Sequence, residues 1–251
     1  MKIVVIGGTG LIGSKLVAAL SARGHDAVAA APSTGVNTIT GEGLAEVMSG
    51  ASVVVDVSNS PALDDSAIEF FRAATNNVLA AEKNAGVGHH VVLSVVGTAE
   101  LARQSGYFQA KLLQEKLIGE GPIPFSIVHA TQFFEFVDTL ADAATVGDTV
   151  VYPPAYFQPM AAADVAEGVA ITAVGDPVNG VVEIGGPEAV LLPDLIRTAL
   201  TARGDSRTVV TDPAAQYWGI DIGERTLVPG TDARLFDTRF EDWLLEAAAK
   251  S

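Results

Sequence analysis

The sequence predicts an α/β fold in which a doubly wound parallel sheet carries a small C-terminal lobe. The chain has 251 residues, of which 49% are hydrophobic, enough to bury a large core. Short apolar runs alternate with longer segments of helical periodicity, the pattern of β-α-β units, and the runs are nearly continuous, as in strands buried on both faces. We therefore expect a single domain over residues 1–251, with residues from about 131 onward supplying lid and lobe elements.

The expected elements follow from this periodicity. The expected strands are Lys2–Ile6, Asp26–Ala31, Ser52–Asp56, His90–Val95, Phe125–His129 and Val181–Ile184. The expected helices are Leu11–Arg23, Leu44–Met48, Asp64–Ala85, Lys111–Gly119, Asp164–Val174, Pro193–Arg203 and Thr231–Ala249. After Ala130 the pattern becomes irregular and richer in proline, which indicates loops added to a scaffold.

Charge and composition exclude several classes of partner. The chain has 30 acidic and 15 basic residues, a formal net charge of -15, so its field repels phosphate backbones and anionic lipids. We therefore expect no nucleic-acid and no membrane partner. The chain has no cysteine, and its His, Asp and Glu residues lack metal-ligand spacing, so no metal is expected. The first strand leaves no room for a signal peptide, and we expect a cytoplasmic protein.

A glycine-rich turn stands between the first expected strand and the first expected helix. Glycines at this place let backbone N–H groups approach a pyrophosphate, whose charge the helix N-terminus favours. The strand, turn and helix together make the motif more specific than the glycines alone. The sequence thus predicts a Rossmann-type dinucleotide site with these cofactor-binding residues: Gly7, Thr9, Gly10, Leu11, Ile12 and Gly13.

The end of the second strand bears on the choice of cofactor. An NAD site usually has Asp or Glu there to bind the ribose 2′-hydroxyl, whereas this strand runs into Ala31 and the hydroxyl residues Ser33 and Thr34. These hydroxyls could donate to a 2′-phosphate, so we predict that NADP(H) is preferred. NAD(H) stays open, because no Lys or Arg lies between Arg23 and Arg72 to pair with the phosphate. Ordinary turn chemistry is the alternative for both hydroxyls.

A serine at the end of a strand is followed by a Tyr-x-x-x-Lys motif. Ser94 ends the expected strand, and Tyr107 and Lys111 follow four residues apart, so that on a helix their side chains share one face. A phenol with an ordinary pKa of about 10 is a poor base at neutral pH until a nearby cation favours its anion. We therefore predict Ser94, Tyr107 and Lys111 as catalytic residues.

Together with the N-terminal glycine turn, this set resembles the short-chain dehydrogenase/reductase superfamily over essentially the whole chain. The nearest resemblance is to its atypical NmrA-like or NAD(P)H-binding branch. It implies that Tyr107 is the general acid/base, that Lys111 binds the nicotinamide ribose and lowers the pKa of Tyr107, and that Ser94 orients a carbonyl. The implied activity is that of an NADP(H)-preferring carbonyl reductase or alcohol dehydrogenase.

Two other functions stay open within this resemblance. A non-enzymatic NmrA-like sensor of NADP(H) would bind a protein partner without turnover, and the intact Ser, Tyr and Lys set counts against it. An epimerase or dehydratase with a permanently held cofactor uses the same groups. Many superfamily members also have a catalytic asparagine before the serine strand, but its usual place falls near Phe71, so we assign neither Asn76 nor Asn77.

Further residues are expected near the ligands. Ser58 and Asn59 follow the third strand at the carboxyl edge of the sheet, where ligands of doubly wound folds bind, and should neighbour the cofactor. The resemblance places backbone contacts to the nicotinamide at Thr131. The expected substrate residues are Val95, Phe133, Phe134 and Phe157, an apolar set suited to a bulky apolar or aromatic carbonyl or alcohol, with core packing as the alternative.

Structural roles are considered for four more polar residues. His89 and His90 begin a strand at the opposite edge, which favours packing over catalysis. His129 ends the next strand and is equally compatible with a pocket or a satisfied polar group. Asp164 reads as a helix N-cap. The sequence leaves open whether the chain forms a homo-oligomer.

Overall fold

The computed structural model describes residues 1–62 and 64–249 and forms two compact units. The first unit comprises residues 1–129 and 165–182, and the second comprises residues 130–164 and the residues from 183 onward.

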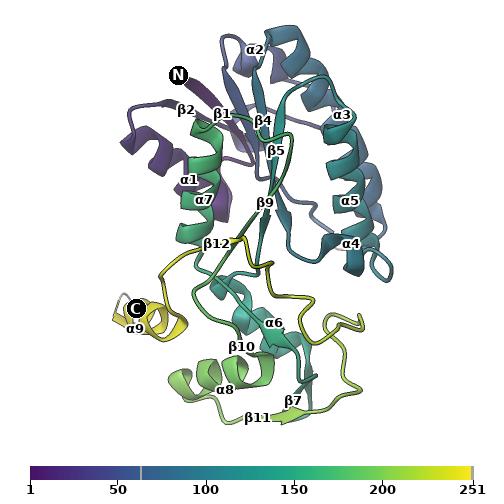
Figure 1. Cartoon of the computed structure of the whole chain (residues 1–251), viewed down its shortest axis with the longest axis vertical. Helices are drawn as coiled ribbons and strands as arrows, with labels where there is room; N and C mark the ends of the chain where they lie inside the picture. Colours follow the sequence, from purple (N-terminus) through teal and green to yellow (C-terminus); the bar gives the residue numbers. More distant parts are fainter. Residues whose placement is uncertain (63, 250–251) are drawn as a thin grey trace. The chain divides into compact units, whose positions relative to one another are not determined.

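The main sheet has seven strands in the order β12-β9-β5-β4-β3-β1-β2 (Figure 1). Its strands are β1 (Lys2–Ile6), β2 (Asp26–Ala30), β3 (Val53–Asp56), β4 (His89–Val95), β5 (Phe125–Ala130), β9 (Gly180–Gly185) and β12 (Arg234–Leu235). Strand β1 pairs in parallel with both β2 and β3, and β3 pairs in parallel with β4. The predicted doubly wound α/β fold is therefore confirmed, and the strand order reverses direction between β1 and β3, where such folds bind ligands.

Helices cover both faces of this sheet in the first unit. They are α1 (Leu11–Ala22), α2 (Leu44–Met48), α3 (Ser66–Ala85), α4 (Thr98–Leu101), α5 (Gly106–Gly119) and α7 (Ala162–Val174). Helices α1 and α7 lie on one face, and α3 and α5 lie on the other (Figure 1). The central residues Ile3, Val4 and Val5 are completely buried, as a strand covered on both sides requires.

The second unit contains short strands that the sequence pattern did not predict. They are β6 (Thr145–Val146), β7 (Thr149–Tyr152), β8 (Tyr156–Phe157), β10 (Val190–Leu191) and β11 (Thr208–Thr211). Helix α6 (Val137–Ala143) was not predicted either, whereas α8 (Leu192–Arg203) and α9 (Phe240–Ala249) correspond to the two C-terminal helices expected from the sequence. Strands β11, β7 and β6 form a small sheet, and β8 pairs antiparallel with β10.

Most expected element boundaries lie within two residues of those in the structure, and two helix starts differ by more. Helix α5 begins at Gly106 rather than Lys111, and a Cβ atom at residue 106 would lie 2.0 Å from the Asp65 carboxylate, so only glycine permits this close approach. Helix α9 begins at Phe240 rather than Thr231, since part of the intervening segment forms β12. Helix α7 begins at Ala162, so Asp164 lies inside it rather than at its expected N-cap position, and the Glu135 carboxylate accepts the N–H of Ala162.

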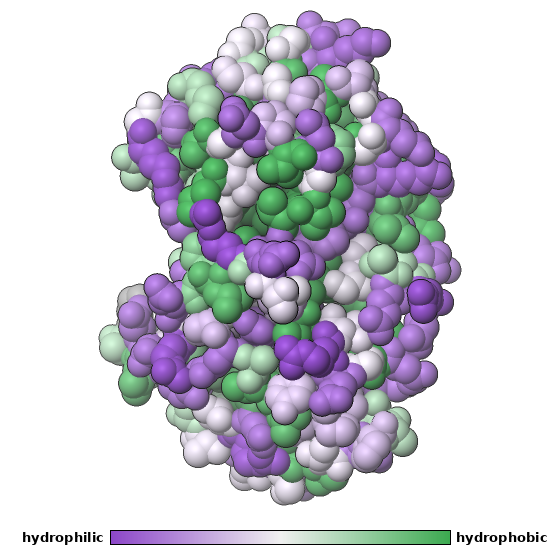
Figure 2. Space-filling view, viewed as in Figure 1, coloured by the Kyte–Doolittle hydropathy of each residue, from purple (hydrophilic) through white to green (hydrophobic). Residues whose placement is uncertain are grey.

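The surface mixes hydrophobic and hydrophilic side chains. On the face drawn in Figure 2, hydrophobic side chains form separate patches among hydrophilic ones. Within residues 1–62 and 64–249, no helix has the length and apolar character needed to cross a bilayer.

Candidate active site

The glycine turn is built by close backbone approaches at the carboxyl end of β1. Gly7 has a φ of +77°, and a Cβ atom there would lie 2.8 Å from the backbone nitrogen of Ser58. A Cβ atom on Gly13 would lie 2.1 Å from the carbonyl oxygen of Gly7. Both positions therefore require glycine for the fold itself, which brings the first turn of α1 and the loop after β3 together.

Gly10 differs from these two glycines. A Cβ atom there would meet only the Gly7 carbonyl oxygen, at 3.3 Å, a tight contact but a much less close one than at Gly7 or Gly13. Thr9, Gly10 and Leu11 are exposed, and α1 begins at Leu11 without a side-chain cap. The uncapped N–H groups and partial positive charge of this helix end fit a pyrophosphate.

Ser33 and Thr34 lie on a short 3₁₀ turn after β2 and have different surroundings. The Ser33 hydroxyl is exposed and lies 3.5 Å from the Thr9 hydroxyl, which places it next to the glycine turn. The Thr34 hydroxyl accepts the Ala31 N–H at 2.9 Å and lies 3.0 Å from the Ala31 carbonyl oxygen. Thr34 thus shows the turn chemistry weighed as its alternative, whereas Ser33 keeps its hydroxyl toward solvent.

The end of β3 carries a buried carboxylate. Asp56 pairs with Ile6 in the sheet register, and one of its oxygens accepts both the N–H and the hydroxyl of Ser58, at 2.9 and 2.6 Å. Its other oxygen accepts the Gln114 side-chain N–H at 3.0 Å. Asp56 therefore fixes the loop that packs against the glycine turn.

The Tyr107 hydroxyl donates a 3.0 Å hydrogen bond to Oδ1 of Asn59 in the loop after β3. The Tyr107 ring packs edge-on against Phe71 from α3 and Phe108. Burial raises the pKa of Tyr107 to about 12, although the bond to Asn59 opposes this shift. The expectation that Lys111 lowers this pKa is therefore not met, and the phenol is protonated at neutral pH.

Lys111 lies on the same face of α5 but directs its ammonium elsewhere. The Nζ atom donates to the Leu93 carbonyl oxygen at 2.9 Å and to the Gln114 side chain, and it lies 4.7 Å from the centre of the Phe71 ring. Burial lowers the pKa of Lys111 to about 8, while the charges of Asp56 and Glu115 oppose that shift. Lys111 and Tyr107 thus both contact Phe71 but have different hydrogen-bond partners.

Ser94 belongs to a different hydrogen-bonded group. Its hydroxyl donates to Oε1 of Glu115 on α5, and Nε2 of His129 on β5 lies 3.0 Å from the same oxygen. Burial alone would raise the pKa of Glu115, but the hydrogen bonds of His129 and Ser94 outweigh it and hold that pKa below its ordinary value. The structure therefore does not bring the Ser94 hydroxyl to Tyr107, because an ionised carboxylate holds its hydrogen.

Three of the ligand-binding residues expected in the second unit are buried. Thr131 donates its N–H to the Ile184 carbonyl oxygen at 3.1 Å, and its buried hydroxyl has no partner among the described residues. Phe134 packs against Phe240 and Trp243, and Phe157 is completely buried. The expectation that Phe134 and Phe157 line a substrate pocket is corrected, because both lie in the core of this unit.

Phe133 and Val95 remain half-buried. The Phe133 ring stacks on exposed Phe136 with 5.8 Å between the ring centres, so this pair offers an apolar surface. The Val95 carbonyl oxygen accepts the Thr98 hydroxyl at 2.6 Å, which fixes the turn after β4.

The other polar residues resolve into structural roles. His90 pairs with Glu82 at 2.6 Å, and His89 pairs with the Ser126 hydroxyl at 2.8 Å, so both histidines are packing residues as expected. The Asn77 amide donates to the Thr38 and Ile39 carbonyl oxygens.

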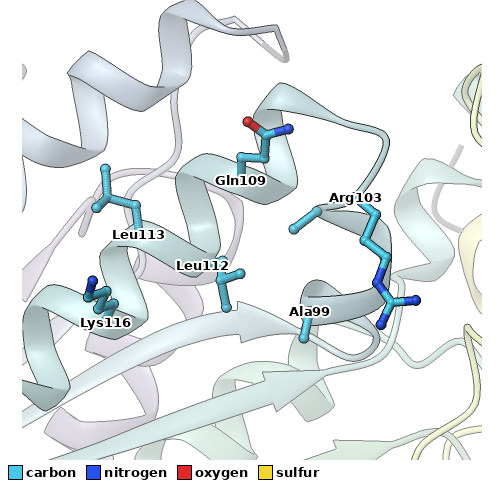
Figure 3. A pocket seen from close by; sticks show the side chains of 7 residues that line it. Ala99, Arg103, Gln109, Leu112, Leu113 and Lys116 are labelled. Atoms are coloured by element: carbon cyan, nitrogen blue, oxygen red, sulfur yellow. The ribbon is translucent and has the colours of Figure 1, made fainter.

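A surface hollow of about 360 Å³ lies beside helices α4 and α5 (Figure 3). Leu112 and Leu113 of α5 supply apolar lining, and Arg103 and Lys116 bring positive charge to it. Ser94, Tyr107 and Lys111 are not among the residues that line it, so it is separate from the groups described above.

Sequence reasoning missed Asp56, Gln114 and Glu115 as partners of the predicted residues. A signal existed for Glu115, because it lies four residues after Lys111 and so shares its face of α5. The partners of Asp56 and Gln114 join β3 to α5 across the fold, which no local spacing reveals.

Residues 3–94 match the family model described as the NAD dependent epimerase/dehydratase family. A search of curated proteins gives no match. Solved structures share the fold, among them a short-chain dehydrogenase/reductase superfamily protein from Agrobacterium tumefaciens with bound NAD. It is 18% identical with a TM-score of 0.75, and the alignment covers 99% of this chain and 96% of that chain.

Two other similar structures carry a named activity. UDP-N-acetylglucosamine 4-epimerase from Bacillus cereus is 17% identical with a TM-score of 0.74, over 100% of this chain and 97% of that chain. An NADPH-dependent quinone oxidoreductase from Escherichia coli, complexed with NADPH, is 18% identical with a TM-score of 0.67, over 85% and 78%. The family model thus covers an N-terminal part of the chain, and the similar structures share its fold.

Proposed function

We propose that this chain, with an N-terminal segment of the NAD-dependent epimerase/dehydratase type, is an NADP(H)-preferring oxidoreductase that reduces a carbonyl or oxidises an alcohol. The observation that carries the proposal is the Tyr107 phenol, which contacts the loop after β3 while that same loop packs against the glycine turn. A proton-transferring group is thereby held beside the predicted dinucleotide site.

The residues of the first unit fit a nicotinamide dinucleotide. The uncapped start of α1 and the adjacent Gly10 would receive the pyrophosphate. The exposed Ser33 hydroxyl beside Thr9 would meet the 2′-phosphate, and Ser58, Asn59 and Lys111 would hold the nicotinamide half. When bound, the nicotinamide supplies or accepts the hydride.

The chemistry assigned to the chain is proton transfer by Tyr107. Its phenol is protonated at neutral pH, because burial raises its pKa to about 12, so it can give a proton to a carbonyl oxygen whose carbon gains a hydride. The phenolate that remains then takes a proton back from solvent.

An apolar or aromatic carbonyl compound is the proposed substrate class. Its support is the half-buried Phe133 and its stacked neighbour Phe136, which present apolar surface in the second unit. Comparable turnover of an aryl ketone and a small charged keto acid would contradict it.

An epimerase or dehydratase is the second candidate, and the family match over residues 3–94 favours it. Such an enzyme would retain its dinucleotide through purification and would act on a nucleotide sugar without net oxidation. The discriminating experiment mixes purified protein with NADPH and a panel of ketones, aldehydes, quinones and nucleotide sugars. Loss of NADPH absorbance with a carbonyl compound supports the reductase, and sugar conversion without added cofactor supports the epimerase.

Gly10→Val tests the cofactor site separately. The side chain would intrude on the proposed pyrophosphate site while leaving the tight contacts of Gly7 and Gly13 in place. We expect cofactor affinity to fall at least about ten-fold, and Ala22→Val, which creates the same side chain at the exposed other end of α1, to leave it unchanged. Unchanged affinity in Gly10→Val would contradict the site.

A further inference from the structure

The hydroxyls of Ser94 and Tyr107, both predicted to act on the substrate, differ in how easily they can leave their present hydrogen-bond partners and turn toward it. The Ser94 side chain is buried, with a residue exposure of 2%, and its hydrogen is held by the Glu115 carboxylate. Tyr107 is half-buried, and its hydrogen is held by a neutral amide oxygen on exposed Asn59. Hydrogen bonds to a charged acceptor are about twice as strong as neutral ones, so Tyr107 is the easier of the two to turn toward a substrate.

The Asn59 side chain has a fixed orientation. Its Oδ1 atom accepts the Tyr107 hydroxyl at 3.0 Å and the Ser60 backbone N–H at 3.0 Å. A backbone N–H can only donate, so the atom facing it must be the amide oxygen. The Nδ2 group, with two hydrogens to donate, is therefore the atom on the other side of the carboxamide.

This orientation gives Asn59 the donor function that Ser94 lacks. An amide N–H next to the Tyr107 hydroxyl can stabilise the negative charge that develops on a carbonyl oxygen, as donors do in oxyanion holes. Asn59 also lies in the loop that Gly7 contacts and Asp56 anchors, so its backbone is held by the sheet edge.

Resting on the proposed function, we infer that Asn59 is a further catalytic residue, whose Oδ1 atom holds the Tyr107 hydroxyl before the substrate binds and whose Nδ2 group donates to the substrate carbonyl oxygen once the Tyr107 O–H has turned toward that oxygen. In the reduction, the carbonyl carbon gains a hydride from NADPH and the oxygen gains the Tyr107 proton. The Tyr107 O–H bond breaks, and solvent restores its proton. Asn59 exchanges no proton and stabilises the oxygen.

The test uses benzaldehyde and NADPH with four variants of the 251-residue protein. Asn59→Asp keeps an oxygen for Tyr107 and Ser60 but removes the donor, whereas Asn59→Ala removes the donor without leaving a carboxylate to hold the Tyr107 hydrogen, and Asn76→Asp adds the same charge as Asn59→Asp at an exposed position on α3. We expect both Asn59 variants to lower kcat by roughly 10² to 10³, as loss of one oxyanion donor does, a loss larger than any change in the KM for NADPH. Asn76→Asp should match the unmodified protein, and Ser94→Ala should lose less than about ten-fold.

Two kinetic results would overturn the inference. The first is a change confined to the KM for NADPH in Asn59→Asp, which would make Asn59 a cofactor contact only. The second is a Ser94→Ala loss as large as that of Asn59→Asp, which would return the donor role to Ser94.

A measurement without turnover separates this inference from the proposed function. With tyrosine labelled at Cζ, the signal that disappears in Tyr107→Phe identifies Tyr107 among the 4 tyrosines. We expect this signal to shift in Asn59→Ala and to stay in place in Asn76→Asp. If no carbonyl compound is reduced, the proposed function fails, but the Tyr107 signal still tests the Asn59 contact. A Tyr107 signal that does not move in Asn59→Ala would overturn that contact.

Discussion

Replacing Tyr107 with phenylalanine should separate the chemistry of this residue from its packing. The ring keeps its contacts with Phe71 and Phe108, whose ring centres lie 6.5 and 5.2 Å away, and loses only the hydroxyl. The lost hydrogen bond joins the phenol to exposed Asn59, so its net contribution to stability is about 0.5–1.5 kcal/mol. A domain of ordinary stability, about 5–15 kcal/mol, stays folded after such a loss.

The expected loss of turnover in Tyr107→Phe is much larger. General acid/base catalysis contributes about 10² to 10⁴ in rate, or roughly 2.7–5.5 kcal/mol of activation free energy. The pKa raised to about 12 keeps Tyr107 protonated, so carbonyl reduction by the unmodified protein should show no loss from Tyr107 titration between neutral pH and that value.

The assay for Tyr107→Phe follows NADPH consumption together with cofactor affinity and thermal unfolding. Tyr156→Phe is the matched control, because it deletes a phenol hydroxyl in the second unit and should leave all three measurements nearly unchanged. Retention of most reductase activity by Tyr107→Phe would refute the catalytic assignment of Tyr107.

Three further outcomes are expected. Ser33→Asp should reduce the preference for NADPH over NADH by calorimetry, because a carboxylate beside Thr9 repels a 2′-phosphate, and unchanged preference would contradict the assigned phosphate position. Lys111→Ala should lower turnover and cofactor affinity together. In the unmodified protein, NADPH affinity should fall as the pH rises past the Lys111 pKa of about 8, because the lysine then loses its positive charge, and Lys111→Ala should lack this pH dependence. Burial, together with the charge of His90, lowers the pKa of His89 from 6.5 to about 4, so the folded state favours neutral His89. Its contribution is present above pH 6.5 and is lost as the pH falls toward about 4, by up to about 3 kcal/mol, and denaturant unfolding of His89→Gln should lack this loss.

The sequence pattern predicted the first unit well because its strands are buried on both faces. Lys2–Ile6 and its parallel neighbours are continuous apolar runs, and the glycine turn has a local signature that depends on backbone geometry. The second unit resisted prediction because β8 and β10 have two residues each, too few for any periodicity to appear.

The candidate site shows the same division between local and long-range information. The Tyr107 and Lys111 spacing correctly placed both side chains on one face of α5, since that is a property of the helix. Their partners depend on tertiary packing. Asn59, 48 residues from Tyr107, accepts the Tyr107 hydroxyl hydrogen, and Glu115 accepts the Ser94 hydroxyl hydrogen. The residue spacing therefore could not show that Ser94 bonds to a charged group, nor that the pKa of Tyr107 is raised.

The division into units has a consequence for how the chain can be cut. The polypeptide passes from one unit to the other after His129, Asp164 and Val182, so neither unit is a continuous segment. A fragment ending at His129 would lack all of α7 and would expose the sheet face that this helix covers (Figure 1). Truncation therefore cannot isolate the first unit in folded form, and a nick in the 130–164 segment should leave two fragments that hold together only as a non-covalent pair.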